Sequence, residues 1–289
     1  MSIGRLPNPT RTFVALSGPS ASLGAAMSPG GEREDMERFR EVAARAALAA
    51  GRVVRNAEVP EPELKGRADY VTEVDRAAEE AAREVLGKES PGVPVLGEEL
   101  GGRESDRYWL IDPLDGTVNF LHRFPIVGVS VALVDDGRPV AGAVHAPYLD
   151  TTFSAARGQG AEQDGAPLRV SEVPPERAVV GTGFPFRHKD RLPEYLKVMI
   201  PALGLFEDLR RPGAVALDLA WVAAGVFDGF FEIGLSSWDV AAGALLIQEA
   251  GGTVTDWSGG DDYLAGDVLA GSGPVHEQLL ELAVDIGSR

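Results

Sequence analysis

The sequence contains no cysteine among its 289 residues. A disulfide framework, a cysteine-ligated zinc or iron–sulfur centre and a thiolate nucleophile are therefore all excluded. At this length, folding can bury roughly three-quarters of the surface of the extended chain, so stability needs no covalent or metal crosslink. The absence of cysteine agrees with a cytoplasmic location, which we expect for this protein.

Basic residues and long apolar runs are also scarce. The chain has 27 Lys and Arg against 44 Asp and Glu, which gives a formal net charge of −17. Nucleic acids and anionic membranes both favour clustered positive charge, so we expect neither as a partner. No stretch approaches the roughly 18 consecutive apolar residues of a membrane span. The four histidines show no metal-ligand spacing; they are His122, His145, His188 and His276.

The first 35 residues are rich in Gly, Pro, Ser and Ala and lack helical or strand periodicity. Their longest apolar run, residues 13–16, is too short for the core of a signal peptide. We expect residues 1–35 to be a disordered tail or to precede the true start. Apolar residues recur at helical spacing from Met36 onward, which predicts an amphipathic helix over residues 37–57.

The order of the predicted elements divides the remaining chain, residues 36–289, into two halves. The first half, residues 36–177, has two helices and then short apolar strands, with a hairpin turn at Asp136-Gly137. The second half, residues 178–289, alternates strands and helices. Its predicted strands lie near 178–181, 229–233, 253–255 and 268–270, and its helices near 191–203, 214–225, 238–250 and 275–285. This order predicts an antiparallel α+β half packed on an α/β half, with a site between them.

The stretch with the most chemical information is residues 109–120, WLIDPLDGTVNF. An apolar strand leads to Asp112, a proline turn follows, and Asp115 comes three residues later, so both carboxylates leave the sheet at one end. The N–H groups of Gly116 and Thr117 can bind an anion where a helix begins. Hard oxygen ligands beside an anion site suit Mg²⁺ holding a phosphate. Taken alone, the stretch can also be explained as a solvated Asp-rich turn.

Two further acidic sites favour a catalytic interpretation. Glu98 and Glu99 follow another apolar strand, and Asp239 opens a mostly apolar helix directly after Trp238. An acidic residue at a helix N-terminus is often only a cap, worth about 1 kcal/mol. Between an aromatic residue and an apolar run, however, Asp239 is expected to be buried at a cleft, and buried acids need cations.

Four ordered motifs resemble the inositol monophosphatases of bacteria, a family of the lithium-sensitive, magnesium-dependent phosphatase superfamily. They are residues 65–72 (KGRADYVT), 97–99 (GEE), 112–120 (DPLDGTVNF) and 238–243 (WDVAAG). The resemblance runs from about residue 37 to 285, and segments 181–187 and 216–219 also look like bacterial members. It implies a layered α-β-α-β-α sandwich of the sugar-phosphatase type, a phosphoric monoester hydrolase and a homodimer.

The resemblance also implies a set of metal ligands. Glu98, Asp112 and the carbonyl of Leu114 would bind a first Mg²⁺. Asp112, Asp115 and Asp239 would bind a second, so that Asp112 bridges the two ions. Glu98 would also help to bind a third, looser ion. Lithium inhibition is expected because lithium would displace one Mg²⁺.

Further roles follow from the same resemblance. Asp69 and Thr117 match the pair that orients the attacking water. The N–H groups of Gly116 and Thr117, next to Asp115, match those that bind the phosphate. Glu232, seven residues before Asp239, matches a residue that binds substrate hydroxyls. One departure is Val118, which stands where a second threonine is common.

The sequence predicts hydrolysis by a metal-activated water without a covalent intermediate. Aspartyl-phosphate chemistry uses two Asp two positions apart, whereas Asp112 and Asp115 are three apart. The expected substrate is a small phosphorylated polyol, myo-inositol monophosphate first, because Glu232 would accept hydrogen bonds from vicinal hydroxyls. Arg187 lies on a loop that could instead attract a second phosphate. Fructose 1,6-bisphosphate and histidinol phosphate therefore remain alternative substrates, and a non-catalytic partner-binding protein is the alternative from another class.

Overall fold

The computed structural model describes residues 29–59, 63–66 and 69–284. Eight strands form the larger sheet, in the order β10-β9-β8-β7-β6-β5-β3-β4, and five form a second sheet, in the order β12-β11-β13-β15-β14. The larger sheet contains β3 (Val95–Gly97), β4 (Gly101–Gly102), β5 (Arg107–Asp115), β6 (Gly128–Asp135), β7 (Arg138–Ala146), β8 (Thr151–Ala156), β9 (Ala161–Gln163) and β10 (Ala166–Pro167). The second sheet contains β11 (Val179–Thr182), β12 (Asp208–Arg210), β13 (Gly229–Glu232), β14 (Thr253–Thr255) and β15 (Val268–Gly271).

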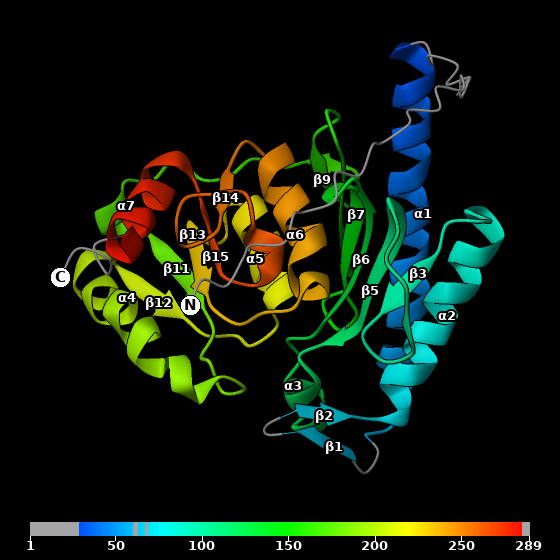
Figure 1. The fold of residues 1–289 in the computed structure, drawn as a ribbon, viewed down its shortest axis with the longest axis horizontal. Helices are drawn as coiled ribbons and strands as arrows, with labels where there is room; N and C mark the ends of the chain where they lie inside the picture. Colours follow the sequence, from blue (N-terminus) through cyan, green and yellow to red (C-terminus); the bar gives the residue numbers. More distant parts are fainter. Residues whose placement is uncertain (1–28, 60–62, 67–68, 285–289) are drawn as a thin grey trace, which may run out of the picture.

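Helices cover both faces of each sheet (Figure 1). The outer layer on the larger sheet is α1 (Pro29–Asn56) with α2 (Glu73–Glu89). The layer between the two sheets is α5 (Val215–Ala223) with α6 (Ser237–Glu249), and the layer beyond the second sheet is α4 (Leu192–Leu205) with α7 (Gly273–Val284). The predicted α-β-α-β-α sandwich is thus confirmed. No helix in the described part of the chain combines the length and apolar character needed to cross a bilayer.

Strands β6 and β7 are buried almost throughout because helices cover both faces of their sheet. All residues of β6 except the last, and all residues of β7 except the first, are buried. The turn between them is the predicted Asp136-Gly137 pair, and both residues have positive φ angles. Such a turn matches the twist of the two strands.

Helix α1 begins at Pro29, eight residues before the start of the predicted helix 37–57, so residues 29–35 are helical where a disordered tail was one of the two expectations. Proline fits the first turn of a helix, where its missing N–H group has no partner to lose. The glycines after it are poor helix formers, so the sequence pattern gave no signal there. The expectation for residues 1–28 concerns a segment outside the described residues.

Strand β5 continues to Asp115, past the turn expected after Asp112. Its register with β6 shifts between these two residues, where Pro113 has no N–H group to donate to the neighbouring strand. The two aspartates therefore leave one irregular strand end rather than a free turn. Six short strands were not expected from the sequence: β1 (Glu63–Gly66), β2 (Asp69–Val71), β4, β9, β10 and β12.

Candidate active site

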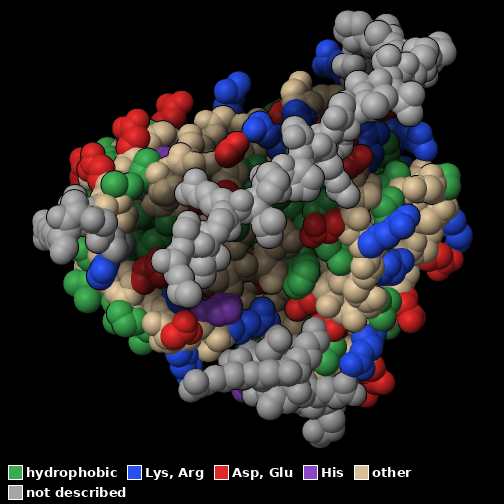
Figure 2. All heavy atoms as spheres, viewed as in Figure 1, with side chains coloured by type: hydrophobic (Ala, Val, Ile, Leu, Met, Phe, Trp, Pro, Cys, Tyr) green, Lys and Arg blue, Asp and Glu red, His purple; other side chains and the backbone are tan. Residues whose placement is uncertain are grey.

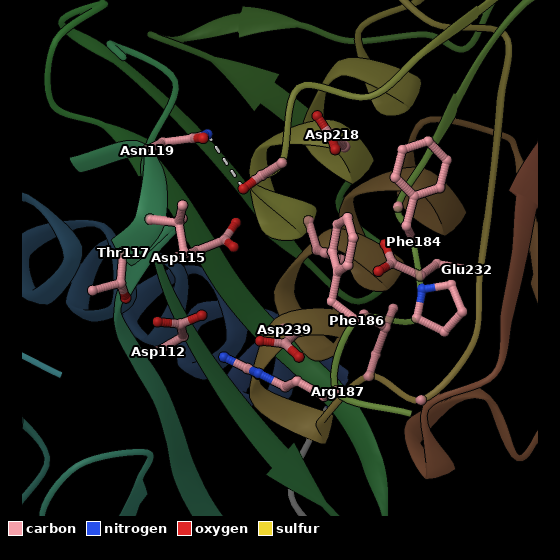
Figure 3. Close-up of a pocket in the computed structure, with 18 of the residues that line it drawn as sticks. Asp112, Asp115, Thr117, Asn119, Phe184, Phe186, Arg187, Asp218, Glu232 and Asp239 are labelled. Carbon is pink, nitrogen blue, oxygen red and sulfur yellow. Dashed lines mark hydrogen bonds between the residues drawn. The ribbon is translucent and has the colours of Figure 1, made fainter. Parts of the chain in front are cut away.

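A pocket of about 330 Å³ lies where the two halves of the chain meet. One wall is the end of β5 with the short helix α3 (Thr117–Leu121), and the opposite wall includes the loop after β11, the end of β13 and the start of α6 (Figure 3). The pocket brings together nine of the predicted site residues. These are Glu98, Asp112, Leu114, Asp115, Gly116, Thr117, Arg187, Glu232 and Asp239.

Asp112 and Asp115 are both buried at the irregular end of β5. One oxygen of Asp112 accepts a hydrogen bond from the N–H of Leu114 at 3.0 Å. One oxygen of Asp115 accepts from the N–H of Ala216 at 2.7 Å, at the N-terminus of α5. The helix start favours the charged form of Asp115. Each carboxylate thus has one oxygen fixed by the backbone.

Asp239 and Glu98 complete the acidic lining from two other elements. Asp239 is the third residue of α6, where its carboxylate accepts from the N–H of Ser236 at 2.7 Å in a reciprocal capping box. Asp239 therefore does cap α6, and its side chain is also buried at the pocket. Glu98 follows β3, and its N–H donates to the carbonyl of Ile111, next to Asp112, at 3.1 Å.

Burial and the charges of neighbouring acids raise the pKa of Asp112 and of Asp115. Burial, and then the charges of Glu98, Asp115 and Asp239, hold the pKa of Asp112 well above its usual range. Burial and the charge of Asp239 raise the pKa of Asp115 to about 7. Like charges gathered in a poorly solvated pocket are unfavourable unless protons or cations neutralise them.

The donor set fits a hard divalent cation, because four carboxylates and the carbonyl of Leu114 line one pocket. Among the described residues, no three acidic or histidine side chains converge closely enough to hold an ion as they stand. Repulsion between uncompensated carboxylates favours such a spread arrangement. The division of these residues between individual ions stays a prediction.

Among the described side chains, the carboxylate that contacts the Thr117 hydroxyl is that of Asp75, and the expected pairing of Thr117 with Asp69 stays a prediction. The hydroxyl of Thr117 lies 3.2 Å from Oδ1 of Asp75 and 3.1 Å from the carbonyl oxygen of Leu114. Asp75 is buried in the first turn of α2, where it also accepts from the N–H of Thr72 at 2.8 Å. Burial raises the pKa of Asp75, and its hydrogen bonds partly offset this effect. The side chain of Asp69 is outside the described set.

Gly116 has the conformation that its place before α3 requires. Its φ is +89°, in the left-handed region that favours glycine, and a Cβ there would lie 3.1 Å from the carbonyl oxygen of Ile126. The side-chain amide of Asn119 donates to the carbonyls of Ile126 and Pro212 at 2.7 and 2.9 Å. Asn119 therefore connects α3 to the loop before α5.

Glu232 reaches the pocket from the end of β13 (Figure 3). A Cβ at Gly183 would lie 2.1 Å from its carboxylate, so any other residue at 183 would have to displace the Glu232 side chain. Burial, and then the charge of Asp239, raise the pKa of Glu232 to about 8, although Arg211 lowers it in part. One of its carboxylate oxygens is buried without a hydrogen-bond partner among the described residues.

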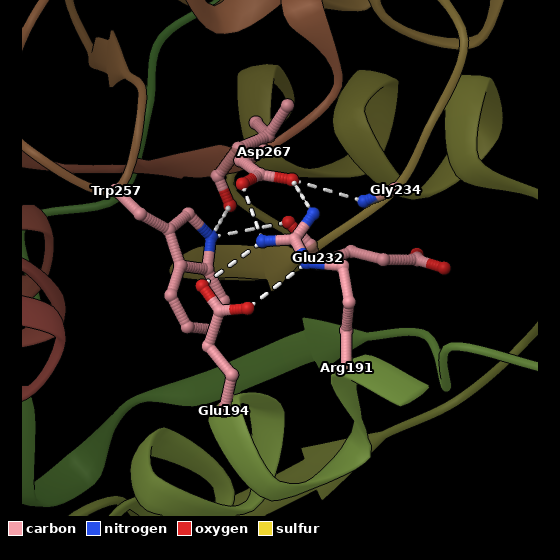
Figure 4. Close-up of polar contacts among 7 residues, drawn as sticks. Arg191, Glu194, Glu232, Gly234, Trp257 and Asp267 are labelled. Atoms are coloured by element: carbon pink, nitrogen blue, oxygen red, sulfur yellow. Dashed lines mark hydrogen bonds and ion pairs between the residues drawn. The ribbon is translucent and has the colours of Figure 1, made fainter. Parts of the chain in front are cut away.

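A polar network fixes the backbone on both sides of Glu232 (Figure 4). The indole N–H of Trp257 donates to the carbonyl of Glu232 at 3.1 Å. The N–H of Gly234 donates to Asp267 at 3.1 Å, and Arg191 donates to both oxygens of Asp267 at 2.7 Å. Because Arg191 follows the loop that carries Arg187, this network also ties that loop to β13.

Sequence reasoning missed two pocket residues on the second half of the chain. The guanidinium of Arg211 lies 5.8 Å from the ring centre of Phe184 and 5.5 Å from that of Phe186. Asp218 is buried on α5 with one carboxylate oxygen unpartnered, and burial followed by the charge of Asp115 holds its pKa well above the usual range. The signal for Asp218 was a single acid inside the apolar run 214–223.

The chain is similar to several bacterial proteins over most of its length. It is 44% identical to the Nus factor SuhB of Pseudomonas aeruginosa over 85% of this chain and 95% of that protein. It is 43% identical to the inositol-1-monophosphatase of Mesorhizobium japonicum over 83% and 94%. It is 38% identical to the fructose-1,6-bisphosphatase/inositol-1-monophosphatase of Aquifex aeolicus over 86% and 97%.

Solved structures have the same fold. The extragenic suppressor protein SuhB of Bartonella henselae superposes with a TM-score of 0.80 at 40% identity, over 84% of this chain and 97% of that one. The inositol monophosphatase of Anabaena gives 0.77 at 33% identity, over 87% and 97%. The model of the inositol monophosphatase family matches residues 35–288. The chain therefore belongs to the inositol monophosphatase family, whose members are generally metal-dependent.

Proposed function

We propose that this protein hydrolyses a phosphate monoester with the help of two or three Mg²⁺ ions, and that myo-inositol monophosphate is its substrate. The observation that carries the proposal is the gathering of Glu98, Asp112, Asp115 and Asp239 in one pocket beside the N–H groups of Gly116 and Thr117. Carboxylate oxygens suit Mg²⁺, which in turn suits phosphate. Lithium inhibition is expected as a consequence of the same ion sites.

In the proposed reaction, the side chains on the β5 side of the pocket bind and orient the reactants. Bound divalent ions would lower the pKa of water and neutralise charge on the phosphoryl and leaving oxygens. Thr117, fixed by Asp75, holds the attacking water in line with the leaving alcohol. The N–H groups of Gly116 and Thr117 bind phosphoryl oxygens, because they begin α3 and point away from its hydrogen-bonded turns.

The opposite wall of the pocket selects the alcohol. The unpartnered oxygen of Glu232 supports a polyol, whose hydroxyl groups would donate to it. Arg187 and Arg211 line the same pocket and support the alternative of a substrate with a second phosphate, such as fructose 1,6-bisphosphate. The name of the Aquifex aeolicus relative agrees with that alternative. Histidinol phosphate is a further alternative on the same metal site.

A role in binding a partner without catalysis is the alternative from another class. The name of the Pseudomonas aeruginosa relative, a Nus factor, supports keeping it. The buried acids argue against a role in partner binding alone. The pKa values of Asp112 and Asp115 are both raised, so their charged forms are unfavourable in the pocket. A protein that only bound partners would gain nothing from this uncompensated charge.

A panel of phosphate esters tests the proposal. We expect Mg²⁺-dependent release of phosphate, with the highest kcat/KM for inositol monophosphate among inositol monophosphate, fructose 1,6-bisphosphate, histidinol phosphate and a phenolic phosphate. A higher kcat/KM for the bisphosphate would favour the alternative substrate. Absence of hydrolysis for all four esters with Mg²⁺ present would favour the partner-binding role.

We also propose that the protein is a homodimer. A row of exposed apolar side chains along α4 supports self-association, and Figure 2 shows hydrophobic side chains at the edge where α4 lies. The row consists of Leu192, Leu196, Ile200 and Leu203. Light scattering should give a mass near twice the 30.5 kDa of one chain. Ile200→Glu should lower that mass and Lys197→Glu, on the same helix, should not; an unchanged mass in Ile200→Glu would exclude this face.

A further inference from the structure

A second buried carboxylate of α2 contacts the backbone next to an active-site residue. Glu79 lies one helical turn after Asp75 on the same side of the helix and is fully buried. It does not line the pocket. Its partners are instead the backbone of the turn that follows β3 and carries Glu98.

Glu79 accepts hydrogen bonds from two consecutive N–H groups of that turn. Oε2 of Glu79 lies 2.8 Å from the nitrogen of Glu99 and 3.2 Å from that of Leu100. Hydrogen bonds from backbone amides to a buried carboxylate are among the stronger ones in proteins. They fix the two peptide groups directly after Glu98.

The other oxygen of Glu79 faces Arg83, four residues later on α2. Nε of Arg83 donates to Oε1 at 2.7 Å, and the same guanidinium donates to the carbonyl of Gly101. Glu79 is thus held from both sides, and Arg83 also contacts the far end of the same turn. The carboxylate is neutralised by a cation that is itself fixed.

Gly97 shows how closely the turn packs on Glu79. A Cβ at residue 97 would lie 2.0 Å from Oε1 and 2.3 Å from the carboxyl carbon of Glu79. The glycine directly before Glu98 therefore allows the helix side chain to reach the backbone. On its other side the turn is fixed to β5, because the N–H of Glu98 donates to the carbonyl of Ile111.

We propose that Glu79, supported by Arg83, is a positioning residue that holds the 97–100 turn so that Glu98 stays beside Asp112 at the pocket, and that it thereby sets the affinity for divalent cations. This inference rests on the proposed function, because it takes Glu98 as a metal ligand. Together with the contact between Asp75 and Thr117, it makes one side of α2 the support for two parts of the site.

The test measures cation binding separately from folding. Glu79→Gln keeps the size of the side chain but removes its charge and one acceptor oxygen. Isothermal titration of the metal-free full chain with Mg²⁺ should give a dissociation constant raised about tenfold or more, as for other partners that orient metal ligands. At saturating Mg²⁺, kcat should recover to within about threefold of the wild-type value, because the reacting groups are intact.

Asp228→Asn is the matched control. Asp228 is also buried, and its carboxylate accepts from a backbone amide, the N–H of Val179, at 2.6 Å in the second sheet. Its substitution should lower the Tm of the metal-free protein and leave the Mg²⁺ dissociation constant unchanged. Arg83→Gln changes a partly exposed residue and should raise the Mg²⁺ dissociation constant several-fold. This variant replaces Glu79→Gln as the test if Glu79→Gln does not fold.

Three results are distinguishable. If Glu79→Gln folds and binds Mg²⁺ as the wild type does, the positioning role of Glu79 is wrong. If it does not fold, an unchanged dissociation constant in Arg83→Gln overturns the proposal. If the wild-type protein itself binds no Mg²⁺, the proposed function is wrong. The positioning role of Glu79 is then wrong as well, because Glu98 binds no ion.

Discussion

The hydroxyl of Thr117 and the carboxylate of Asp75 lie 3.2 Å apart, although 42 residues separate them in the sequence. The contact joins the first turn of α2 to the first turn of α3, at one side of the acidic pocket. The capping box with Thr72 holds Asp75 in place, so the same hydrogen bonds that begin α2 also position the carboxylate.

Asp75→Asn should reduce kcat strongly. The variant can still accept a hydrogen bond from Thr117, but it lacks the charge that would favour proton loss from the attacking water. Loss of such a group typically lowers the rate by about 100-fold or more. Steady-state kinetics at saturating Mg²⁺ measures the effect.

Asp69→Asn is the matched comparison, because the sequence pattern assigned the same role to Asp69. We expect its kcat to stay within about threefold of wild type, since Thr117 has its carboxylate partner in Asp75. A large loss in Asp69→Asn combined with a small loss in Asp75→Asn would restore the first assignment.

Glu232→Gln should discriminate between substrates. Removing a charged acceptor from a hydrogen bond costs roughly 1.5–3 kcal/mol. The kcat/KM for inositol monophosphate should therefore fall about tenfold or more, whereas that for a phenolic phosphate without hydroxyl groups should change much less. Equal losses for both substrates would mean that Glu232 acts through structure or general electrostatics.

The raised pKa of Glu232 should also appear in the stability of the metal-free protein. Its pKa is about 8 in the folded chain, against an ordinary value of 4.5. Between these values the folded state holds the proton more tightly than the unfolded state, so this residue lowers stability as the pH rises. The slope is at most about 1.4 kcal/mol per pH unit.

Denaturant unfolding in chelator between pH 5 and pH 8 isolates this effect. The stability of Glu232→Gln relative to wild type should increase as the pH rises through that window. Glu277→Gln, which removes an exposed carboxylate on α7, should show no such trend. A parallel pH dependence in wild type and Glu232→Gln would show that Glu232 carries its charge throughout.

The order of the elements and the acidic end of β5 were predicted well because their signals are local, whereas the layered arrangement followed from the family resemblance. The alternation of elements and the run 109–120 depend only on neighbouring residues, and the structure places Asp112, Asp115 and Thr117 together at one strand end. Asp69 and Asp75 are chemically alike and lie in the same segment, so no local pattern could indicate that the Asp75 carboxylate contacts Thr117 across 42 residues. The role proposed for Glu79 likewise depends on a contact across 20 residues that no spacing rule indicates.

The cation dependence of phosphate release tests the account most directly. Purified metal-free protein would be titrated with Mg²⁺ while phosphate release from inositol monophosphate is measured, alongside Asp112→Asn. We predict no measurable release without the ion, saturable activation with it, and loss of at least about 100-fold in Asp112→Asn, because the site would lose the carboxylate shared by two ions. Release at the same rate in excess chelator, or near wild-type turnover in Asp112→Asn, would contradict the account.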